Sequence, residues 1–463
     1  MLPDFVERVA ARVGAEFVRA DPASLNAYAS DALGQGHPPD LVVLPGSTGE
    51  VAAVARLCDE HRVPLVVRGA GTGYTGGAVP THGGVVLSME RLNRILEIDE
   101  LNLLAVVEPN VVNADLQRAV ERVGLFYPPD PASLGQSSIG GNVAECAGGP
   151  RAFKYGTTRR YVLALEAVLP TGEVINTGSK AVKNVVGYDL TQLLIGSEGT
   201  LAIITKITLR LMPRPHATAT MLATFSGIGT AVDAVSELLR RRVVPAAIEL
   251  IDRNSLDAIR PALDPRLVAP DTGAVLIVEV DGTTSGVDDD LASADRACRA
   301  AGAVEVTRAA DAAQRDAIWA VRRQVSLALK ATGLVKVNHD VVVPRGRVPE
   351  LFEVIAEMKR TFDLRVASFG HAGDGNIHVN VMLTPGDEEE RARATKAERF
   401  LFTHVVALEG SISGEHGIGF AKAPYLGLEL SDVEIALMQR VKAAFDPNGI
   451  LNPGKIFPPT TGS

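Results

Sequence analysis

Residues 68–77 read RGAGTGYTGG, and Gly71 to Gly76 within them match the dinucleotide-binding pattern G-x-G-x-x-G. In a Rossmann fold this pattern closes a strand and opens a helix. Here PLVV (64–67) predicts a strand before the loop, but the segment after it reads AVPTHGG and leads into a second apolar run, VVL. Because proline and paired glycines break a helix that has just begun, the predicted order is strand, glycine loop, strand. Two interpretations remain: an ordinary glycine-rich turn, or a loop whose backbone N–H groups bind a phosphate.

The composition is that of an ordinary globular protein with two or three domains. The chain has 463 residues, of which 46% are hydrophobic and 22% charged. Its net charge of -9 argues against binding to nucleic acid or to an anionic membrane. The N-terminus lacks the apolar core of a signal peptide, and no apolar run approaches the ~20 residues of a membrane span. The three cysteines are far apart, which favours a reducing compartment, and we predict a cytoplasmic protein.

The clearest domain boundary is the stretch MPRP at residues 212–215. Before it, helical and strand patterns alternate, interrupted by a long glycine-rich region at 128–158 that we predict to be a functional loop. After it, the order strand, helix, strand occurs twice, in TATMLATFS to AAIELID and in AVLIVEVDG to AVEVTRA. Two such units in series are typical of a ferredoxin-like domain.

Two glycine-rich stretches near the C-terminal end carry histidines and a carboxylate. In HAGDGNIHVN, side chains alternate along a predicted strand, so His378 and Asn380 share one face and His371 can return towards it from the turn. In SGEHGIG, Glu415 lies beside His416. Two imidazoles and a carboxylate are a common ligand set for a divalent metal, and a further histidine could act as a general base. The alternative is that these residues make capping and turn hydrogen bonds, and the spacing alone names no reaction.

Arg322 lies on a predicted helix, DAIWAVRRQVSLALKA, with Ser326 one turn further on. It is either a ligand for an anionic group or part of a solvated helix face, and its neighbour Arg323 could equally be the exposed one. We interpret Lys336 and the run EEERARA as surface residues.

Seven stretches occur in an order that is specific as a set: RGAGTGYTGG, PPDPAS…GGNVAECAGGP…KYG, KNVVGYDL, GSEGT, HAGDGNIH, GEHGIG and DPNGILNPGK. Over nearly its whole length the chain therefore resembles the FAD-linked oxidase family, whose FAD domain is of the vanillyl-alcohol-oxidase type. The resemblance implies an α+β fold. A two-subdomain FAD-binding domain would span residues 1–213 and an inserted ferredoxin-like substrate domain with the metal site residues 214–410. A helical C-terminal segment, 411–463, would pack back on the FAD domain.

The resemblance also implies where FAD binds. The glycine loop would hold the pyrophosphate, the region 131–156 would pass along the flavin and its ribityl chain, and 198–204 would flank the adenine. Cys146 stands where many relatives have asparagine, which puts one local flavin contact in doubt, and no residue suggests covalent attachment of the flavin. The residues implied to bind FAD are Arg68, Gly69, Ala70, Gly71, Thr72, Gly73, Tyr74, Gly76, Pro131, Gly135, Ser138, Gly141, Asn142, Ala144, Gly148, Tyr155, Gly156, Glu198, Gly199, Ile204 and Asn452.

The activity implied by the resemblance is the oxidation of a small 2-hydroxy acid to the 2-oxo acid, with hydride transfer to the flavin. Family members act on glycolate, D-lactate or D-2-hydroxyglutarate, so we expect the D-enantiomer where one exists. The implied ligands of a divalent metal (Zn, Fe or Mn) are His371, His378 and Glu415. The implied catalytic residues are the base His416 and the substrate contacts Arg322, Asn380 and Ser326.

The electron acceptor is left open by the sequence. No cysteine set for an iron–sulfur cluster is present, so the reduced flavin would pass electrons to a partner protein, a quinone, an electron-transfer flavoprotein or oxygen. A homodimer and a complex with an iron–sulfur subunit are both compatible with the resemblance. Two alternatives are an FAD-binding subunit that is active only within a multi-subunit complex, and a metal-dependent hydrolase with a nucleotide-binding accessory domain.

Overall fold

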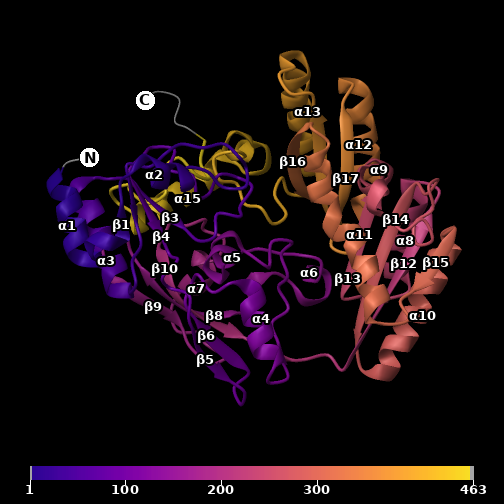
Figure 1. The fold of residues 1–463 in the computed structure, drawn as a ribbon, viewed down its shortest axis with the longest axis horizontal. Coiled ribbons are helices and arrows are strands. Elements are labelled where there is room, and N and C mark those ends of the chain that lie inside the picture. Colours follow the sequence, from indigo (N-terminus) through magenta and orange to yellow (C-terminus); the bar gives the residue numbers. More distant parts are fainter. Residues whose placement is uncertain (1–2, 459–463) are drawn as a thin grey trace. The chain divides into compact units, whose positions relative to one another are not determined.

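The computed structural model describes residues 3–458 (Figure 1), which divide into two compact units. The first unit contains the described residues up to 148, Thr157–Arg214, and those from Glu415 onward. The second contains Gly149–Gly156 and Pro215–Gly414. Helices and sheets occur in both units, which confirms the α+β class.

The first unit is built on two main sheets, as a two-subdomain FAD domain requires. One sheet has the strand order β1-β2-β4-β3, the other β5-β6-β10-β8-β9, and a short pair is formed by β11 and β7. Its helices and strands are α1 (Pro3–Val13), β1 (Val18–Arg19), α2 (Pro22–Ala27), β2 (Leu41–Val43), α3 (Thr48–His61), β3 (Leu65–Arg68), β4 (Val85–Ser88), β5 (Ile95–Asp99), β6 (Leu104–Val107), α4 (Asn113–Glu121), β7 (Leu125–Phe126), α5 (Ile139–Glu145), β8 (Val162–Val168), β9 (Val174–Gly178), α7 (Leu190–Leu194), β10 (Ile203–Arg210), β11 (Met212–Pro213), α14 (Leu426–Glu429) and α15 (Asp432–Phe445).

In the four-stranded sheet, β4 lies between β2 and β3 and runs parallel to both. The buried strands β2 and β4 are apolar on both faces, as parallel strands covered on two sides require. Residues of α1 and α3 complete this core. Helix α3 begins at Ser47, whose hydroxyl accepts a hydrogen bond from the Glu50 amide at 3.2 Å.

The second unit is one seven-stranded antiparallel sheet with the order β15-β12-β14-β13-β17-β18-β16. Its first four strands in sequence have the order 4-1-3-2, which confirms the ferredoxin-like pattern, and β16, β17 and β18 extend the sheet. Its elements are α6 (Ala152–Tyr155), β12 (Ala217–Phe225), α8 (Ile228–Arg240), β13 (Ala247–Asp252), α9 (Arg253–Ile259), β14 (Ala274–Gly282), α10 (Thr284–Ala300), β15 (Glu305–Arg308), α11 (Ala312–Ala331), β16 (Val335–Val342), α12 (Val348–Phe362), β17 (Arg365–His371), β18 (Asn376–Leu383) and α13 (Glu388–Ala407).

Helices cover both faces of this sheet. Helices α8, α10, α12 and α13 contact one another on one face, while α9 and α11 form the layer on the other. Helix α11 begins at Asp311, whose carboxylate accepts a hydrogen bond from the Gln314 amide at 2.8 Å. Its apolar side chains lie at helical spacing against the sheet, and Arg322 lies within this buried stripe with 7% of its surface exposed.

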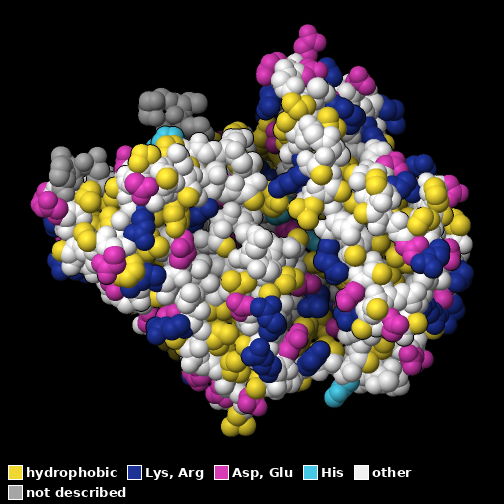
Figure 2. Space-filling view, viewed as in Figure 1, with side chains coloured by type: hydrophobic (Ala, Val, Ile, Leu, Met, Phe, Trp, Pro, Cys, Tyr) yellow, Lys and Arg dark blue, Asp and Glu magenta, His cyan; other side chains and the backbone are white. Residues whose placement is uncertain are grey.

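Acidic and basic side chains are interspersed on the surface seen in Figure 2. Within residues 3–458, no helix combines the length and the apolar character that a membrane span needs.

Two expectations from the sequence are wrong, one about a surface residue and one about a long loop. Glu390, in the run EEERARA, is only 5% exposed. It lies at the start of α13, where its carboxylate accepts a hydrogen bond from the Thr384 amide and pairs with Arg365 at 2.9 Å. The long region 128–158 is also not a continuous loop, because α5 and α6 form within it. Ser138 caps the N-terminus of α5, because its hydroxyl accepts a hydrogen bond from the Gly141 amide.

Candidate active site

The glycine loop joins two parallel strands of the first unit. Strand β3 ends at Arg68, β4 begins at Val85, and the described residues 69–84 between them contain no helix. The prediction of strand, loop, strand is therefore confirmed, and a Rossmann turn is excluded. Gly71 and Gly76 have φ angles of +67° and +80°, a region that glycine enters at no steric cost.

The loop packs against the start of α5, another stretch implied to bind FAD. A Cβ atom at Gly69 would lie 2.4 Å from Ser138 Oγ, so a side chain at this position would displace the hydroxyl that caps α5. Glycine-rich backbone that brings N–H groups close to a ligand suits a pyrophosphate. The first unit thus has a cradle that fits the phosphate part of FAD.

Several other residues implied to bind FAD have side chains committed to the protein itself. The amide of Asn452 donates to the carbonyls of Gly77 and Glu198 at 2.9 and 2.8 Å, and Asn142 donates to Asn113 at 3.1 Å. Tyr155 belongs to the second unit, where its hydroxyl donates to Asp281 at 2.8 Å. Their contacts with FAD stay predictions, and the structure shows them supporting the frame.

Four further residues implied to bind FAD lie in the first unit. Glycines 148 and 199 belong to the first unit, as do the buried Ile204 on β10 and the buried Pro131. A Cβ atom at Gly148 would lie 3.0 Å from a carboxylate oxygen of Glu415, so the end of the region 131–148 is next to the GEHGIG segment. The KNVVGYDL stretch lies between β9 and α7, and Tyr188 within it is 95% exposed.

In the second unit, the candidate site begins at the hairpin of β17 and β18. The register pairs Phe369 with His378, and His371 with Glu249 of β13. Residues that face each other across strands, or that lie two apart along a strand, share one face of the sheet. His371, His378 and Glu249 therefore lie on the face that α11 covers.

Glu249 is fully buried and holds two of the predicted site residues. Its Oε1 lies 2.5 Å from His371 Nδ1, and its Oε2 accepts a hydrogen bond from Arg322 Nε. Burial alone would raise the pKa of Glu249, but the charges of His371 and Arg322 outweigh it and lower the pKa to about 2. Sequence reasoning missed this residue, although a single carboxylate within the apolar strand AAIELID was a signal.

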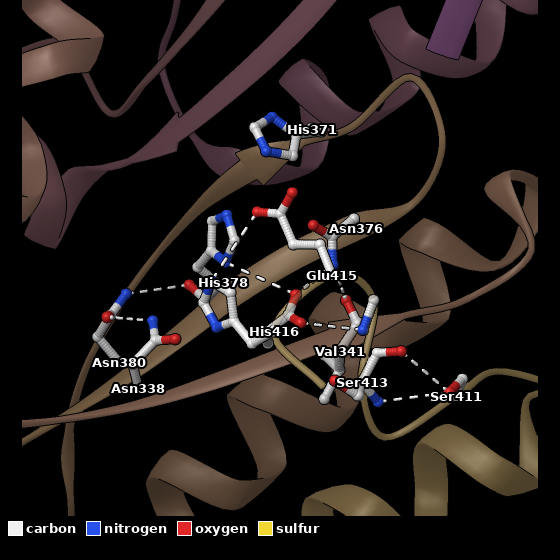
Figure 3. A network of polar contacts seen from close by, with 12 residues as sticks. Asn338, Val341, His371, Asn376, His378, Asn380, Ser411, Ser413, Glu415 and His416 are labelled. Carbon is white, nitrogen blue, oxygen red and sulfur yellow. Dashed lines mark hydrogen bonds and ion pairs between the residues drawn. The ribbon is translucent and has the colours of Figure 1, made fainter. Parts of the chain in front are cut away.

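Because Nδ1 of His371 bonds Glu249, a metal would bind this imidazole through Nε2. Figure 3 shows the imidazoles of His371 and His378 and the carboxylate of Glu415 pointing towards one another. Their nearest ligand atoms all lie within 4.8 Å of one another. The amide of Gly414, directly before Glu415, donates to Asp340 of β16 at 3.0 Å.

The chemistry of this donor set fits a divalent metal. Bonds of about 2.0–2.2 Å to imidazole nitrogen and carboxylate oxygen place ligand atoms about 3–4 Å apart, so small side-chain shifts would complete the site. Zn, Fe and Mn all accept two imidazoles and one carboxylate. Asp340 adds a charge, since its Oδ1 lies 3.8 Å from His378 Nδ1.

Asn380 shares the face of His378 but is fully buried. Its amide donates to the carbonyls of Ala367 and His378, at 3.0 and 3.1 Å, and its oxygen accepts from Asn338 at 2.8 Å. The side chain thus supports the hairpin, and its contact with a substrate stays a prediction.

Lys336 is less exposed than we expected. On β16, two residues before Asn338, it is half-buried and donates a hydrogen bond to Ser326 of α11 at 2.8 Å. Arg322 is buried, whereas Arg323 is exposed. Ser326 and Lys336 therefore join α11 to β16, whereas Arg322, one turn earlier on α11, bonds Glu249 of β13, which also contacts His371.

His416 belongs to the first unit, where its ring stacks on Tyr74 of the glycine loop. The ring centroids are 5.1 Å apart and the planes are inclined by 29°. His416 Nε2 also lies 3.9 Å from Glu415 Oε1. The imidazole thus lies beside the candidate metal ligand.

Comparison with known proteins agrees with this geometry. Residues 39–178 match the family model described as "FAD binding domain", and residues 214–456 match "FAD linked oxidases, C-terminal domain". The chain belongs to the FAD-linked oxidase family. It is 42% identical to glycolate oxidase subunit GlcD of Bacillus subtilis over 420 residues, covering 90% of this chain and 89% of the relative. It is 37% identical to D-lactate dehydrogenase of Anaerostipes hadrus, with the same two coverages.

Solved structures show the same fold for this FAD-linked oxidase. p-Cresol methylhydroxylase superposes with a TM-score of 0.81 at 19% identity, covering 98% of this chain and 96% of that one. 4-Ethylphenol oxidase from Gulosibacter chungangensis gives a TM-score of 0.80 at 20% identity, covering 98% and 97%. The expected FAD fold is thereby confirmed, and the chain is an FAD-binding oxidoreductase.

Gly73 allows a direct test of the FAD cradle. A Cβ atom there would have only Asp31 Oδ2 within 4 Å, at 3.9 Å, so the protein itself leaves room for a side chain. We expect Gly73→Val to fold but to lose FAD, because the added methyl groups would occupy the space where the ligand approaches the backbone. The measurement is flavin content after purification, followed by FAD titration. Gly427→Ala, whose Cβ would also have open space, is the control. Full occupancy with unchanged affinity in Gly73→Val would place FAD elsewhere.

Proposed function

We propose that this FAD-linked oxidase oxidises a small 2-hydroxy acid, the D-enantiomer where one exists, to the 2-oxo acid. The observation that carries the proposal is the grouping, on one face of the second unit's sheet, of two cations, Arg322 and Lys336, with two imidazoles, His371 and His378. Arg322 and Lys336 suit a carboxylate, and His371, His378 and Glu415 suit the neighbouring hydroxyl oxygen. The names of the relatives support this substrate class, since glycolate and D-lactate are both 2-hydroxy acids.

The substrate carboxylate would bind Arg322 and Lys336. Glu249 holds Arg322 through Nε, and this fixes the plane in which the other guanidinium N–H groups point. A planar guanidinium and a nearby ammonium give charge-assisted hydrogen bonds that orient the acid. Ser326, which holds Lys336, would keep the ammonium on this side.

The hydroxyl group would lie at His371, His378 and Glu415, with His416 next to it. A divalent metal bound by these three ligands would supply positive charge that lowers the pKa of the hydroxyl. His416 would accept the hydroxyl proton at its imidazole, a role suited to a side chain that titrates near neutral pH. Glu249 holds the His371 ring in one orientation throughout.

FAD, when bound, supplies the acceptor for the hydride that leaves the substrate carbon. As the carbonyl group forms, His416 would accept the proton that leaves the substrate oxygen, and the hydride would leave the substrate carbon for the acceptor that FAD supplies. The glycine loop would contribute by holding the pyrophosphate through backbone N–H groups.

The reduced flavin must then pass its electrons on. All three cysteines, Cys58, Cys146 and Cys298, are free thiols, and three cysteines are too few for the four thiolate ligands of an iron–sulfur cluster. We propose a partner protein, a quinone or an electron-transfer flavoprotein as acceptor, in the cytoplasm. A second candidate function, an FAD subunit active only within a complex that includes an iron–sulfur subunit, is favoured by the word "subunit" in the name of the Bacillus relative.

The function is tested by anaerobic mixing of the FAD-loaded protein with glycolate, D-lactate and L-lactate, with flavin absorbance as readout. We expect bleaching by glycolate or D-lactate and little by L-lactate. Glu415→Ala and His378→Ala should lose both metal and bleaching, because each removes a ligand. His416→Ala should keep metal and FAD yet bleach ~10²–10⁴-fold more slowly, because a positioned base is missing.

His404→Ala is the control for this series, since among the described residues His404 hydrogen-bonds to the Phe400 carbonyl of its own helix, α13. It should behave as the parent protein. If His416→Ala loses the metal while Glu415→Ala retains it, then His416 is the metal ligand and Glu415 is not. If neither D-lactate nor glycolate bleaches the flavin of the isolated chain, the multi-subunit alternative is favoured.

The pH dependence of substrate binding tests Lys336. Burial, together with the charges of Lys330 and Arg322, lowers the pKa of Lys336 to about 8. The ammonium form is present below this pH and is lost as the pH rises through it. The apparent Kd of the 2-hydroxy acid should therefore rise above pH ~8, at most ~10-fold per pH unit. In Lys336→Arg this rise should be absent up to pH ~10, because arginine stays charged. An equal rise in both proteins would exclude Lys336 from binding the carboxylate.

A further inference from the structure

We propose that Glu198 and Thr75 are positioning residues that hold the segment carrying His416 against the glycine loop. The proposal rests on the proposed role of His416 as the base, and it gives Glu198 a task other than the implied contact with adenine. The segment concerned is 415–421, EHGIGFA, which we name the histidine loop. All contacts described below lie within the first unit.

Glu198 binds the histidine loop from one side. It is 5% exposed and lies in the turn after α7 with a φ angle of +52°. One carboxylate oxygen accepts a hydrogen bond from the amide of Ile418 at 2.8 Å, and the other from the amide of Gly419 at 2.6 Å. A carboxylate that accepts two adjacent N–H groups fixes the path of the backbone more firmly than a single bond does.

Thr75, in the glycine loop itself, binds the histidine loop from the other side. Its hydroxyl donates to the carbonyl of His416 at 3.0 Å, and its carbonyl accepts from the amides of Phe420 and Ala421 at 3.1 and 3.2 Å. A Cβ atom at Gly419 would lie 2.0 Å from the Thr75 carbonyl oxygen, so only glycine permits this approach. The two backbones are therefore in direct contact.

These bonds bracket the imidazole. Thr75 bonds the carbonyl of His416, and Glu198 bonds the amides of Ile418 and Gly419. The Tyr74 ring stacks on the His416 ring. The residue that would take the proton is thus fixed by the loop implied to bind the pyrophosphate of FAD. Since a displacement of about 1 Å in a catalytic group can cost ~10²-fold in rate, such a support has a measurable effect.

The test is a double-mutant cycle with His416, read as flavin reduction by D-lactate or glycolate in the metal-loaded and FAD-loaded protein. Glu198→Gln keeps size but has only one acceptor oxygen, and Thr75→Val keeps shape but loses the hydroxyl. We expect Glu198→Gln to lower the limiting reduction rate ~10- to 100-fold, and Thr75→Val ~3- to 10-fold, with substrate Kd unchanged. In the His416→Ala background each should change the rate less than ~2-fold, because the group they position is gone.

Glu166→Gln is the matched control, since Glu166 is a half-buried carboxylate of the same unit that bonds Thr48 and Lys206. It should leave the rate unchanged in both backgrounds. An equal slowing by Glu198→Gln with and without His416, or no slowing at all, would overturn the proposal. If Glu198→Gln fails to retain FAD, Thr75→Val decides by the same criterion. If His416→Ala itself reduces the flavin at the parent rate, the proposed function fails; if it is slow while Glu198→Gln and Thr75→Val are normal, only the positioning proposal fails.

Discussion

The second unit of this FAD-linked oxidase depends on one buried carboxylate. A charge without solvent is costly unless it is paired, and Glu249 is paired twice, with the Arg322 guanidinium and the His371 imidazole. Both partners are therefore held in position by the same group. Because the pKa of Glu249 is lowered to about 2, the carboxylate stays ionised at any pH at which the protein would be assayed. The cation proposed for the substrate and the ligand proposed for the metal thus share one anchor.

In the first unit, glycines provide the corresponding constraint. Gly69 admits Ser138, and Gly419 admits the carbonyl of Thr75, so the glycine loop is in close contact with both α5 and the histidine loop. Residues far apart in the sequence meet there through backbone groups. The same loop that would hold a pyrophosphate consequently supports the residue proposed as the base.

The sequence predicted the parts of the fold that depend on local pattern. Proline and paired glycines after the fingerprint predicted a strand instead of a helix, and the repeated strand–helix–strand pattern predicted the ferredoxin-like strand order. It did not predict the role of Glu249 or the partial burial of Lys336. Glu249 contacts His371 of a neighbouring strand and Lys336 contacts Ser326 of α11, and the alternation of side chains along one strand does not identify such tertiary contacts. Runs of charged residues usually lie on the surface, and this predicts an exposed Glu390. Instead, its carboxylate accepts a hydrogen bond from the Thr384 amide at the start of α13. The roles of Asn380 and Asn452 in supporting the frame likewise depend on tertiary contacts.

The most direct test of the account is the substitution Glu249→Gln, compared with Glu279→Gln. Glu279 is a buried glutamate on the neighbouring strand β14 that bonds Arg315 and Trp319, so it controls for the loss of a buried charge. The measurement is metal content and substrate Kd on the same FAD-loaded samples. The account predicts that Glu249→Gln lowers metal content and raises Kd together, while Glu279→Gln changes neither. Retention of both metal and substrate affinity in Glu249→Gln, with the fold and FAD intact, would contradict it.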